Sequence, residues 1–550
     1  MRVDLFWLQN DGQPVQAWPL GKVQPVAPEP ATVATVAAAL DAAADAVLFW
    51  DAALGAPDSG LVAALLAGPG DVWHAGLALG MGGLPRLIDF VDPVWRFNRD
   101  PDPGLAAVSW RLSLRACLVR AAVLRALGGP NPAFATLPGA SLELGHRWIA
   151  GGAMMQHVPD LLAPARPREG GAKPALADEF RFVRLRYGRV WAAWAGWRAL
   201  RQGAKPAATA RAWRVSSTVR PVATGRLHTV ANDPDGRDRG DAPTVSVLIP
   251  TLDRYPHLFA LLDQLREQTA PPLEIIVVDQ TEAAARDPEW PRRFADLPLR
   301  VIWRDTAGQC SSRNAGLAVA RGEAVLFLDD DDEIPPDLLA RHLAYLERFA
   351  VDASCGVAEE LGAGPLPAAF RLVRASDVFP TNNTLLRVDA LADAGLFDLA
   401  YERGERADGD LGMRLYLAGK TLGLNPGAAV VHLHAPRGGL RQHKARVVTR
   451  GGSRDSLTRR HLLAATEGYL WSRYFTPHQV HEALLIRSVG TLRGARGGLG
   501  GLARAGLMLL LLPGTWRQNR ARLAEGRAML TRYPAIPVFR REIHQELELL

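Results

Sequence analysis

Cysteine is scarce in this chain. Three of its 550 residues are cysteine, Cys117, Cys310 and Cys355, and none belongs to a C-x-x-C pair or has a companion histidine at zinc-ligand spacing. An odd, sparse set of thiols argues against a disulfide scaffold. It favours a reducing compartment, so we expect a cytoplasmic protein.

Long apolar runs are also missing. The first residues, MRVDLFWLQNDG, hold an acid at position 4 and a very short apolar stretch, which is not typical of a signal peptide. The longest late apolar stretch, residues 505–512, ends at Pro513 and is far short of the roughly 20 residues that a membrane-spanning helix needs. The sequence therefore predicts no spanning helix and at most a peripheral contact with the inner face of a membrane.

No extreme of composition is present. Hydrophobic residues make up 48% and charged residues 22%, which excludes a mainly disordered or fibrous chain. The formal charge of +7 and the pI near 9.6 suit anionic partners such as nucleoside diphosphates or acidic lipid headgroups. A GC-rich genome explains the many arginines and alanines equally well. We expect no nucleic-acid partner.

The chain divides into four regions. Residues 1–163 alternate apolar runs with Gly and Pro breaks. Residues 164–242 hold a basic, tryptophan-rich helix at 175–202 and then a linker rich in Arg, Pro, Gly and Asp. Residues 243–436 show the clearest strand–helix alternation, and residues 437–550 are mostly helical and basic.

Four short apolar runs in the third region are typical of buried strands: residues 245–250 (VSVLIP), 274–279 (EIIVVD), 299–303 and 324–328 (AVLFL). Leucines recur at helical spacing over residues 258–265. Such alternation predicts an α/β fold with a doubly wound, mostly parallel sheet. Ligands bind such sheets beyond the carboxyl ends of the strands.

Four consecutive aspartates, residues 329–332, follow the last of these runs. Carboxylates this close repel one another, so one or more of their pKa values should rise unless a cation is present. Mg²⁺ or Mn²⁺, held by one or two carboxylates plus substrate phosphates, relieves the repulsion. Because Thr251, Asp253 and Asp279 end other strands, we favour a ligand site over an acidic turn that caps a helix beginning at Pro335.

These segments resemble a known family. VSVLIPTLDR, EIIVVDQ and SSRNAGLAVARGEAVLFLDDDDEIPP resemble the donor half of the family-2 glycosyltransferases with the GT-A fold. NNTLLRVDALADAGLFD and ADGDLGMRLYLAGKTLGLNPGAAVVHLH resemble the acceptor half of the same family, in the same order.

The resemblance implies roles for individual residues. It places Asp331 and His432 at an Mn²⁺ or Mg²⁺ ion, with His434 and Asn383 as further candidates for the site. It assigns nucleotide-sugar binding to Thr251, Asp253, Asp279, Arg313, Asp329 and Asp330.

Asp408 has the place of the family's catalytic base. The family usually has Glu-Asp-x-Asp-Leu, whereas this chain has Ala-Asp-Gly-Asp-Leu at residues 407–411, which leaves Asp410 or Glu405 as alternatives. N-capping of a helix beginning near Leu411 is a structural explanation that fits Asp410 better than Asp408. The basic run at residues 437–450 is either a lid over the diphosphate or a solvated loop.

The amino-terminal region contains a second copy of the pattern at a constant offset of 267 residues (387 − 120). Chance similarity between alanine-rich segments is the alternative. The copy has Ala52, Ala53 and Ser141 at the places of Asp330, Asp331 and Asp408, so we expect an incomplete GT-A-like domain that binds neither metal nor nucleotide. The matched residues are Arg120, Gly128, Asn131, Glu143, Leu144, Gly145, Arg147, Gly152 and Pro159 with Arg387, Gly395, Asp398, Asp410, Leu411, Gly412, Arg414, Gly419 and Pro426.

The leading interpretation is an inverting, metal-dependent transferase that builds a polysaccharide, glycolipid or other glycan on a glycan or lipid-linked acceptor. A nucleotidyltransferase is an alternative, but its usual Gly-rich loop after the first strand is absent from residues 251–254. A non-catalytic scaffold is a second alternative, against which the four aspartates and Asp408 count.

Overall fold

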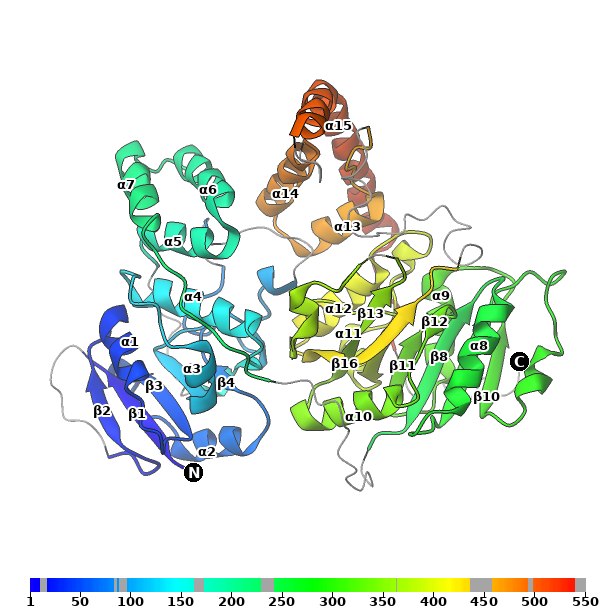
Figure 1. Ribbon diagram of the computed structural model, residues 1–550, viewed down its shortest axis with the longest axis horizontal. Coiled ribbons are helices and arrows are strands. Elements are labelled where there is room, and N and C mark those ends of the chain that lie inside the picture. The colour runs from blue at the N-terminus through cyan, green and yellow to red at the C-terminus, as the bar shows by residue number, and fades with distance from the viewer. Residues whose placement is uncertain are drawn as a thin grey trace.

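The computed structural model describes residues 1–9, 17–83, 87–88, 96–162, 173–228, 242–362, 364–435, 458–492 and 498–539. It contains two α/β sheets side by side, with further helices gathered on one side of them (Figure 1). The α/β class predicted from the sequence is confirmed. The basic run at residues 437–450 lies outside the described residues.

The first sheet belongs to residues 1–162, which we call the amino-terminal unit. It has seven strands in the order β2-β1-β3-β6-β4-β7-β5. The elements are β1 (Val3–Leu8), β2 (Val23–Val26), α1 (Pro30–Ala38), β3 (Ala46–Asp51), α2 (Ser59–Ala67), β4 (Val72–His74), β5 (Ala107–Val108), β6 (Ala116–Arg120), α3 (Ala121–Leu127), α4 (Leu137–Ala150) and β7 (Met155–His157).

The second sheet belongs to residues 242–435, the central unit. Its nine strands run in the order β10-β9-β8-β11-β15-β13-β16-β12, with β14 paired to β16. The elements are β8 (Val245–Thr251), α8 (Tyr255–Arg266), β9 (Glu274–Asp279), β10 (Leu299–Trp303), α9 (Gln309–Val319), β11 (Ala324–Leu328), β12 (Asp332–Glu333), α10 (Leu338–Phe349), β13 (Ala353–Glu360), β14 (Arg374–Ala375), β15 (Asn383–Arg387), α11 (Ala390–Ala394), α12 (Ala407–Leu417) and β16 (Leu422–His432).

The four strands predicted for the central unit are β8, β9, β10 and β11. They are parallel to one another, and β8, β9 and β11 are almost completely buried because their apolar runs are covered on both faces. The rest of the sheet is mixed, since β15 is antiparallel to both β11 and β13. The helix expected to begin at Pro335 begins instead at Leu338, after the short strand β12 and a turn.

The two units share one strand topology. In the amino-terminal unit β1 is parallel to β3, and β3 is antiparallel to β6. In the central unit β8 is parallel to β11, and β11 is antiparallel to β15. The antiparallel pairs also have the same register: Ala46 pairs with Arg120 in β3–β6, and Ala324 pairs with Arg387 in β11–β15. Within its described residues, the amino-terminal sheet has no counterpart of β10 or β12. The repeat inferred from the 267-residue offset therefore corresponds to a repeat of the fold.

A buried acid–arginine pair repeats as well. On α4, Nε of Arg147 lies 3.1 Å from Oε1 of Glu143. On α12, Nε of Arg414 lies 2.9 Å from Oδ2 of Asp410. Nη1 of Arg147 donates to the carbonyl of Leu127, and Nη1 of Arg414 donates to that of Ala394, again 267 residues on. Each arginine thus fastens its helix to the end of the preceding one.

The units meet through reciprocal contacts. A Cβ on Gly152 would lie 2.6 Å from the carbonyl oxygen of Val373, and a Cβ on Gly419 would lie 2.7 Å from that of Ala106. Both glycines have positive φ, 102° and 83°. Helix α4 contacts β14 just as α12 contacts β5. Because each surface meets the equivalent surface of the other copy, the interface has the isologous pattern of a two-fold dimer within one chain.

The helical region between the units differs from the expectation. The single helix predicted at residues 175–202 is two helices, α5 (Leu176–Tyr187) and α6 (Arg189–Arg201), because Gly188 takes a φ of 86° between them. The expected linker contains a third helix, α7 (Pro206–Ser216).

The carboxyl-terminal region is helical, as predicted: α13 (Ala465–Tyr474), α14 (Pro477–Gly490) and α15 (Gly498–Arg532). Helix α15 does not end at Pro513 but continues through it for 35 residues in all. By length and composition alone it is the one helix in the described part of the chain that could cross a membrane. The apolar stretch is short, as the sequence indicates, but polar residues after Pro513 extend the helix beyond it.

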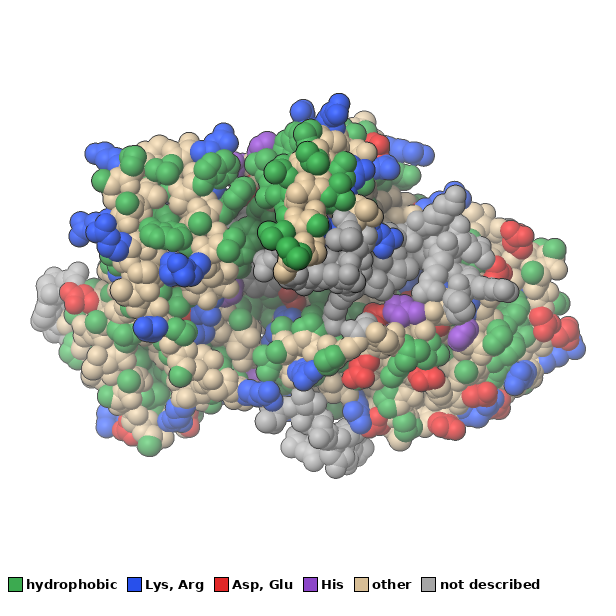
Figure 2. Space-filling view, turned by 45° about the horizontal axis from the view of Figure 1, so that its top comes forward, with side chains coloured by type: hydrophobic (Ala, Val, Ile, Leu, Met, Phe, Trp, Pro, Cys, Tyr) green, Lys and Arg blue, Asp and Glu red, His purple; other side chains and the backbone are tan. Residues whose placement is uncertain are grey.

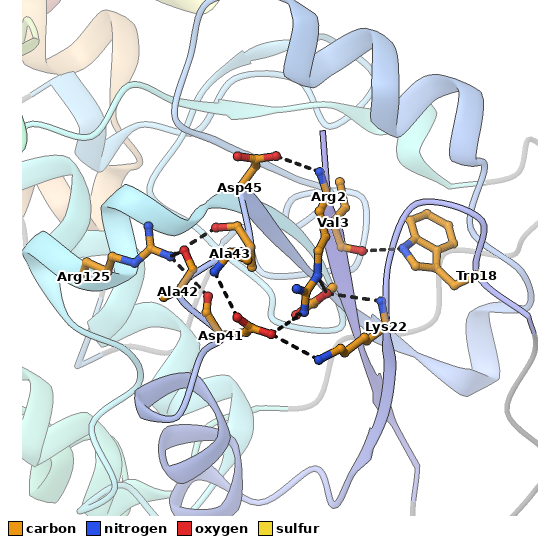
Figure 3. A network of polar contacts seen from close by, with 11 residues as sticks. Arg2, Val3, Trp18, Lys22, Asp41, Ala42, Ala43, Asp45 and Arg125 are labelled. Carbon is orange, nitrogen blue, oxygen red and sulfur yellow. Dashed lines mark hydrogen bonds and ion pairs between the residues drawn. The ribbon is translucent and has the colours of Figure 1, made fainter.

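A polar network fixes the start of β1 (Figure 3). Arg2 pairs with Asp4 at 2.9 Å and with Asp41 at 2.8 Å, and Lys22 reaches Asp41 at 3.2 Å. These acids lie at the amino edge of the parallel strands, opposite the edge where ligands bind. The network therefore anchors the first strand and does not form a ligand site.

Candidate functional site

The carboxyl ends of β8 and β11 meet at one polar cluster. Thr251, the last residue of β8, is buried and donates from Oγ1 to Oδ2 of Asp330 at 2.7 Å. Asp330, Asp331 and Asp332 are also buried, and Asp329 is half-buried. The predicted convergence of these strand ends is therefore present.

Two arginines balance the aspartates. Nη1 of Arg254 lies 2.9 Å from Oδ1 of Asp330 and 3.1 Å from Oδ1 of Asp331. Arg313, on α9, donates to Oδ1 of Asp329 at 2.8 Å. Arg254 was not among the residues singled out from the sequence, although it directly follows Asp253.

The repulsion expected among the aspartates appears as raised pKa values. Burial raises the pKa of Asp330 to about 6, and Asp331 adds to the rise while Arg254 opposes it. Burial also raises the pKa of Asp332, although a hydrogen bond with His432 opposes the rise. The cluster therefore holds charge at a cost that a further cation would relieve.

His432 joins the cluster from β16. Asp332 and His432 are register partners in the β12–β16 pair, and Nδ1 of His432 lies 2.9 Å from Oδ1 of Asp332. Burial lowers the pKa of His432, but the hydrogen bond to Asp332 and the charges of Asp329 and Asp331 outweigh it, so the pKa rises to about 9.

The donor set fits a hard divalent cation. One ligand atom each from Asp329, Asp331 and His432 lies within 4.8 Å of the others. Oδ1 of Asp331 is buried and accepts no hydrogen bond of good geometry. A second group shares His432 and adds Glu360 and His434, which form an ion pair. Carboxylates with an imidazole suit Mn²⁺, and carboxylates with water suit Mg²⁺.

Asp279 lies at the end of β9 and is fully buried. Its carboxylate accepts hydrogen bonds from the hydroxyl of Tyr255 at 2.8 Å, from the backbone of Thr281 at 2.9 Å and from Trp290 at 3.3 Å. Asp253 is exposed, with a φ of 58°. Three internal donors therefore hold the Asp279 carboxylate at the end of β9.

Asp408 lies in the first turn of α12 and is exposed. The loop before α12 is fastened to α9, because the carboxylate of Glu402 accepts 2.9 Å hydrogen bonds from the backbone of Cys310 and Ser311. Helix α9 also carries Arg313. Contacts through α9 therefore connect the loop before α12 to Asp329.

Asp410 has a different environment. It is fully buried, pairs with Arg414 and accepts a 2.6 Å hydrogen bond from the hydroxyl of Tyr474 on α13. N-capping does not explain either aspartate, because α12 begins at Ala407 and its N-cap is Arg406. Asp410 thus connects α12 to Arg414 on the same helix and to Tyr474 on α13.

Asn383 does not face the cluster, contrary to its suggested place at the site. It is fully buried at the start of β15. Its Nδ2 donates to the carbonyls of Val357 and Ala428, and its Oδ1 lies 2.8 Å from Nε2 of His342. These bonds use the amide fully, so the side chain joins strands.

The described residues at the corresponding edge of the amino-terminal unit do not form such a cluster. Asp51, at the end of β3, pairs with Arg115 at 2.6 Å and caps the short helix that follows. Ser141 accepts a hydrogen bond from the backbone of Leu114. Among the described residues, both potential metal-ligand groups lie in the central unit.

Residues 246–368 match the family model described as Glycosyl transferase family 2. The chain is 35% identical over 99 residues to the putative glycosyltransferase EpsH of Bacillus subtilis, covering 18% of this chain and 28% of that protein. It is 32% identical over 108 residues to the amylovoran biosynthesis glycosyltransferase AmsB of Erwinia amylovora, covering 19% and 36%. The matches thus span about a third of these relatives.

Among solved structures, the mannosyltransferase PcManGT from Pyrobaculum calidifontis, in complex with GDP-Man and Mn²⁺, matches with 20% identity and a TM-score of 0.30 over 55% of this chain and 81% of that one. Staphylococcus aureus TarS 1–349, in complex with UDP-GlcNAc, matches with 18% identity and a TM-score of 0.33 over 56% and 91%.

Proposed function

We propose, from the match of residues 246–368 to the Glycosyl transferase family 2 model, that the chain transfers a sugar from a nucleotide-sugar donor to a hydroxyl group of a glycan or lipid-linked acceptor. The observation that carries the proposal is the cluster of Asp329, Asp331 and His432 at the carboxyl edge of the parallel strands. In open α/β sheets this edge binds ligands.

The donor is proposed to bind along β8, β9 and β11. Thr251, Asp253 and Asp279 would contact the nucleoside, and Arg313 would contact the nucleotide phosphates once its pairing with Asp329 loosens. Asp329, Asp331 and His432 would hold Mn²⁺ or Mg²⁺. When bound, such an ion neutralises the charge of the leaving diphosphate.

Transfer also needs an acceptor hydroxyl that loses its proton as it attacks the anomeric carbon. Asp408 is the proposed general base, since its carboxylate is exposed and makes no hydrogen bond within the described residues. The new bond forms from the acceptor oxygen to the anomeric carbon as the bond to the diphosphate breaks. A single in-line displacement of this kind inverts the configuration.

A second part of the proposal is a peripheral membrane contact through α15. One face of this helix packs against α13 and α14 and contains Arg504, Met508, Thr515, Asn519, Leu523 and Gly526. The other face exposes Leu499, Leu502, Leu509 and Leu510 by 60% or more. Figure 2 shows hydrophobic side chains gathered on the helices at the top centre, with Lys and Arg around them. Because one face of α15 is packed against the protein, we propose that the helix lies on a bilayer surface and does not cross it.

The proposed activity is tested by incubating the full chain with UDP-, GDP- and dTDP-linked sugars, with and without Mn²⁺ or Mg²⁺. We expect one nucleotide class to raise the Tm and to release its diphosphate in a metal-dependent manner. Hydrolysis of nucleoside triphosphates without nucleotide-sugar turnover would instead support a nucleotidyltransferase. If no nucleotide raises the Tm, the non-catalytic scaffold is the remaining interpretation.

A further inference from the structure

A cavity of about 510 Å³ lies where the amino-terminal unit, the helices that follow it and the central unit meet. Helices α4 and α5, which pack against each other (Figure 1), contribute Arg147 and Arg186 to its lining. The chain after α7 contributes Thr224 and Arg226, and the central unit contributes Ala368. Three of the described side chains that line the cavity are arginines, and none of them is acidic. The lining is therefore positively charged.

Two of these arginines share one carboxylate. Glu143, which is fully buried on α4, pairs with Nε of Arg147 at 3.1 Å and also with Nη2 of Arg186. The side chains of the two arginines are 4% and 18% exposed. Nε of Arg186 is buried and makes no hydrogen bond within the described residues. Two guanidiniums and one carboxylate leave this group with a net positive charge.

The equivalent group in the central unit carries no net charge. Asp410 pairs with Arg414, as Glu143 pairs with the arginine one turn along α4. The other partner of Asp410 at the end of α13 is the hydroxyl of Tyr474, whereas the partner of Glu143 near the end of α5 is Arg186. The amino-terminal copy therefore has a cation where the central copy has a neutral phenol.

The chain after α7 is fixed against the amino-terminal unit beside this group. The backbone of Gly225 donates to the carbonyl of Ala126 at 2.6 Å, and Nδ2 of Asn131 donates to the carbonyl of Arg220 at 2.9 Å. Arg226, in the same segment, is exposed and lines the cavity. A second guanidinium is thus held near the buried pair by backbone contacts.

The buried charge is only partly compensated. Burial lowers the pKa of Arg147 and of Arg186 to about 10, because the interior disfavours a charged guanidinium. Both side chains stay protonated at neutral pH. Residues 180–228 contain ten arginines and one lysine but no aspartate or glutamate, so the local field also favours an anion.

The arginines differ in what they can offer such an anion. Arg147 donates to Glu143 and to the carbonyls of Leu127, Gly128 and Gly129, which uses its donors inside the protein. Arg186 has a donor left, and the exposed Arg226 has a planar fork that suits oxyanions.

Phosphate chemistry fits this lining. Its donors come from separate elements, and a phosphate presents acceptor oxygens in several directions, whereas a carboxylate presents two in one plane. None of the described lining residues is aromatic, so no ring is offered on which a nucleobase could stack. We propose that the cavity binds the phosphate group of a non-nucleotide ligand through Arg186 and Arg226. The site shares no described residue with the acidic cluster of the central unit and does not depend on the proposed transfer reaction.

The test is calorimetry of the full chain with inorganic pyrophosphate in the presence of EDTA, which keeps divalent ions away from the acidic cluster. The wild type should bind pyrophosphate. Arg186→Tyr reproduces the neutral partner of the central copy and leaves Glu143 paired with Arg147. It should weaken binding by about 10- to 100-fold, the usual effect of losing a charged hydrogen-bond partner. Arg226→Gln replaces an exposed side chain, so it should weaken binding without lowering the Tm.

Arg189→Gln is the matched control, because Arg189 is an exposed cation of the same basic segment and is not among the described lining residues. It should bind pyrophosphate as the wild type does. Equal losses in Arg189→Gln and Arg226→Gln would indicate a diffuse basic surface and overturn the inference. Binding that is lost in Arg313→Gln but kept in Arg186→Tyr would place the anion at the strand ends of the central unit and also overturn it.

Flotation with phosphatidylcholine vesicles, with and without phosphatidic acid, distinguishes two sources of the phosphate. Flotation that requires phosphatidic acid and falls in Arg186→Tyr but not in Arg189→Gln identifies a lipid headgroup. Pyrophosphate binding without such a difference in flotation identifies a free phosphate compound. A wild-type chain that binds neither pyrophosphate nor phosphatidic acid through these arginines has no phosphate site in this cavity.

Discussion

Oγ1 of Thr251 donates a 2.7 Å hydrogen bond to Oδ2 of Asp330 and thereby ties the end of β8 to the loop after β11. The bond, with the pairing of Arg254, fixes Asp330 as an internal member of the cluster. Asp329, Asp331 and His432 are the residues whose potential ligand atoms lie within 4.8 Å of one another.

Asp331→Asn should weaken metal-dependent nucleotide binding, because it removes a carboxylate oxygen from the proposed cation. Calorimetry with the preferred nucleotide, with and without Mn²⁺, measures the effect. Asp337→Asn is a suitable control, as Asp337 precedes α10 and pairs with Arg341 away from the cluster. Unchanged Mn²⁺-dependent affinity in Asp331→Asn would show that the cation is held elsewhere.

Asp408→Asn should leave donor binding nearly intact while transfer falls by about 10²- to 10⁴-fold, the usual contribution of a positioned general base. Asp410→Asn should act on stability instead. It breaks a buried pair with Arg414, so we expect a loss of about 3 kcal/mol in the free energy of unfolding. A Tm series and single-turnover transfer rates distinguish the two. Equal kinetic loss in a fully stable Asp410→Asn would move the base two residues along.

The stability of the metal-free protein should depend on pH through His432. Because its pKa is raised from 6.5 to about 9, its protonation contributes stability that is fully present below pH 6.5 and is lost as pH rises through 9. We expect a loss on the order of 1–3 kcal/mol over this range. Urea unfolding of wild type and His432→Gln measures it, with the exposed His478→Gln as control. If the free energy of unfolding depends on pH in the same way in wild type and His432→Gln, the ion pair between His432 and Asp332 is contradicted.

Adding Mn²⁺ should reverse the trend, since a metal-ligating imidazole must be neutral. Nucleotide-free Mn²⁺ should therefore stabilise the protein more at pH 8.5 than at pH 6.5. A thermal-shift series across that range gives the comparison, and His432→Gln should flatten it.

Leu509→Gln with Leu510→Gln should reduce binding to vesicles that contain anionic lipid. The two side chains are 60% and 81% exposed, so the fold should not change. Arg517, Arg520 and Arg522 on the same helix are exposed, and basic residues at an anionic surface contribute about 1 kcal/mol each before screening. Flotation of the full chain gives the readout. Leu105→Gln with Leu273→Gln, each 42% exposed, is the control pair, and equal flotation of both pairs would exclude α15 as the contact.

Each chain should bind one metal–nucleotide complex. Asp51, the amino-terminal counterpart of Asp329, is held by Arg115 and by the backbone of Ala53, and Ala52 and Ala53 offer no side-chain ligand. Calorimetric stoichiometry should therefore be one, and Asp51→Asn should not alter it. A stoichiometry of two would mean that the amino-terminal unit has kept a site.

The strands of the central unit were predictable because burial on both faces leaves short, continuous apolar runs. The acidic cluster was predictable for a similar reason, as four charges directly after such a run have few stable arrangements. Arg254 and Glu402 were not, because each acts through a partner far along the chain: Asp330 in one case and the amino end of α9 in the other. Only the folded topology brings these pairs together.

Helix boundaries failed where local signals pointed away from the tertiary outcome. Pro513 ends the apolar stretch of the sequence, yet α15 continues through it, because contacts with α13 and α14 support the helix on both sides of the proline. Asn383 failed for the opposite reason. A polar residue near a predicted site suggested a ligand, but its amide is used in bonds to two carbonyls and to His342.

Joining both copies in one polypeptide has an evolutionary consequence. In a symmetric homodimer every substitution occurs twice, so a residue that improves one active site must also be tolerated at the equivalent position of the supporting subunit. Here Gly145 and Gly412 lie in equivalent helices but contact different neighbours. Ala53 has no side-chain ligand atom, whereas its counterpart Asp331 has a carboxylate. Covalent linkage lets the two copies diverge independently while their contact keeps the geometry that identical partners would have had.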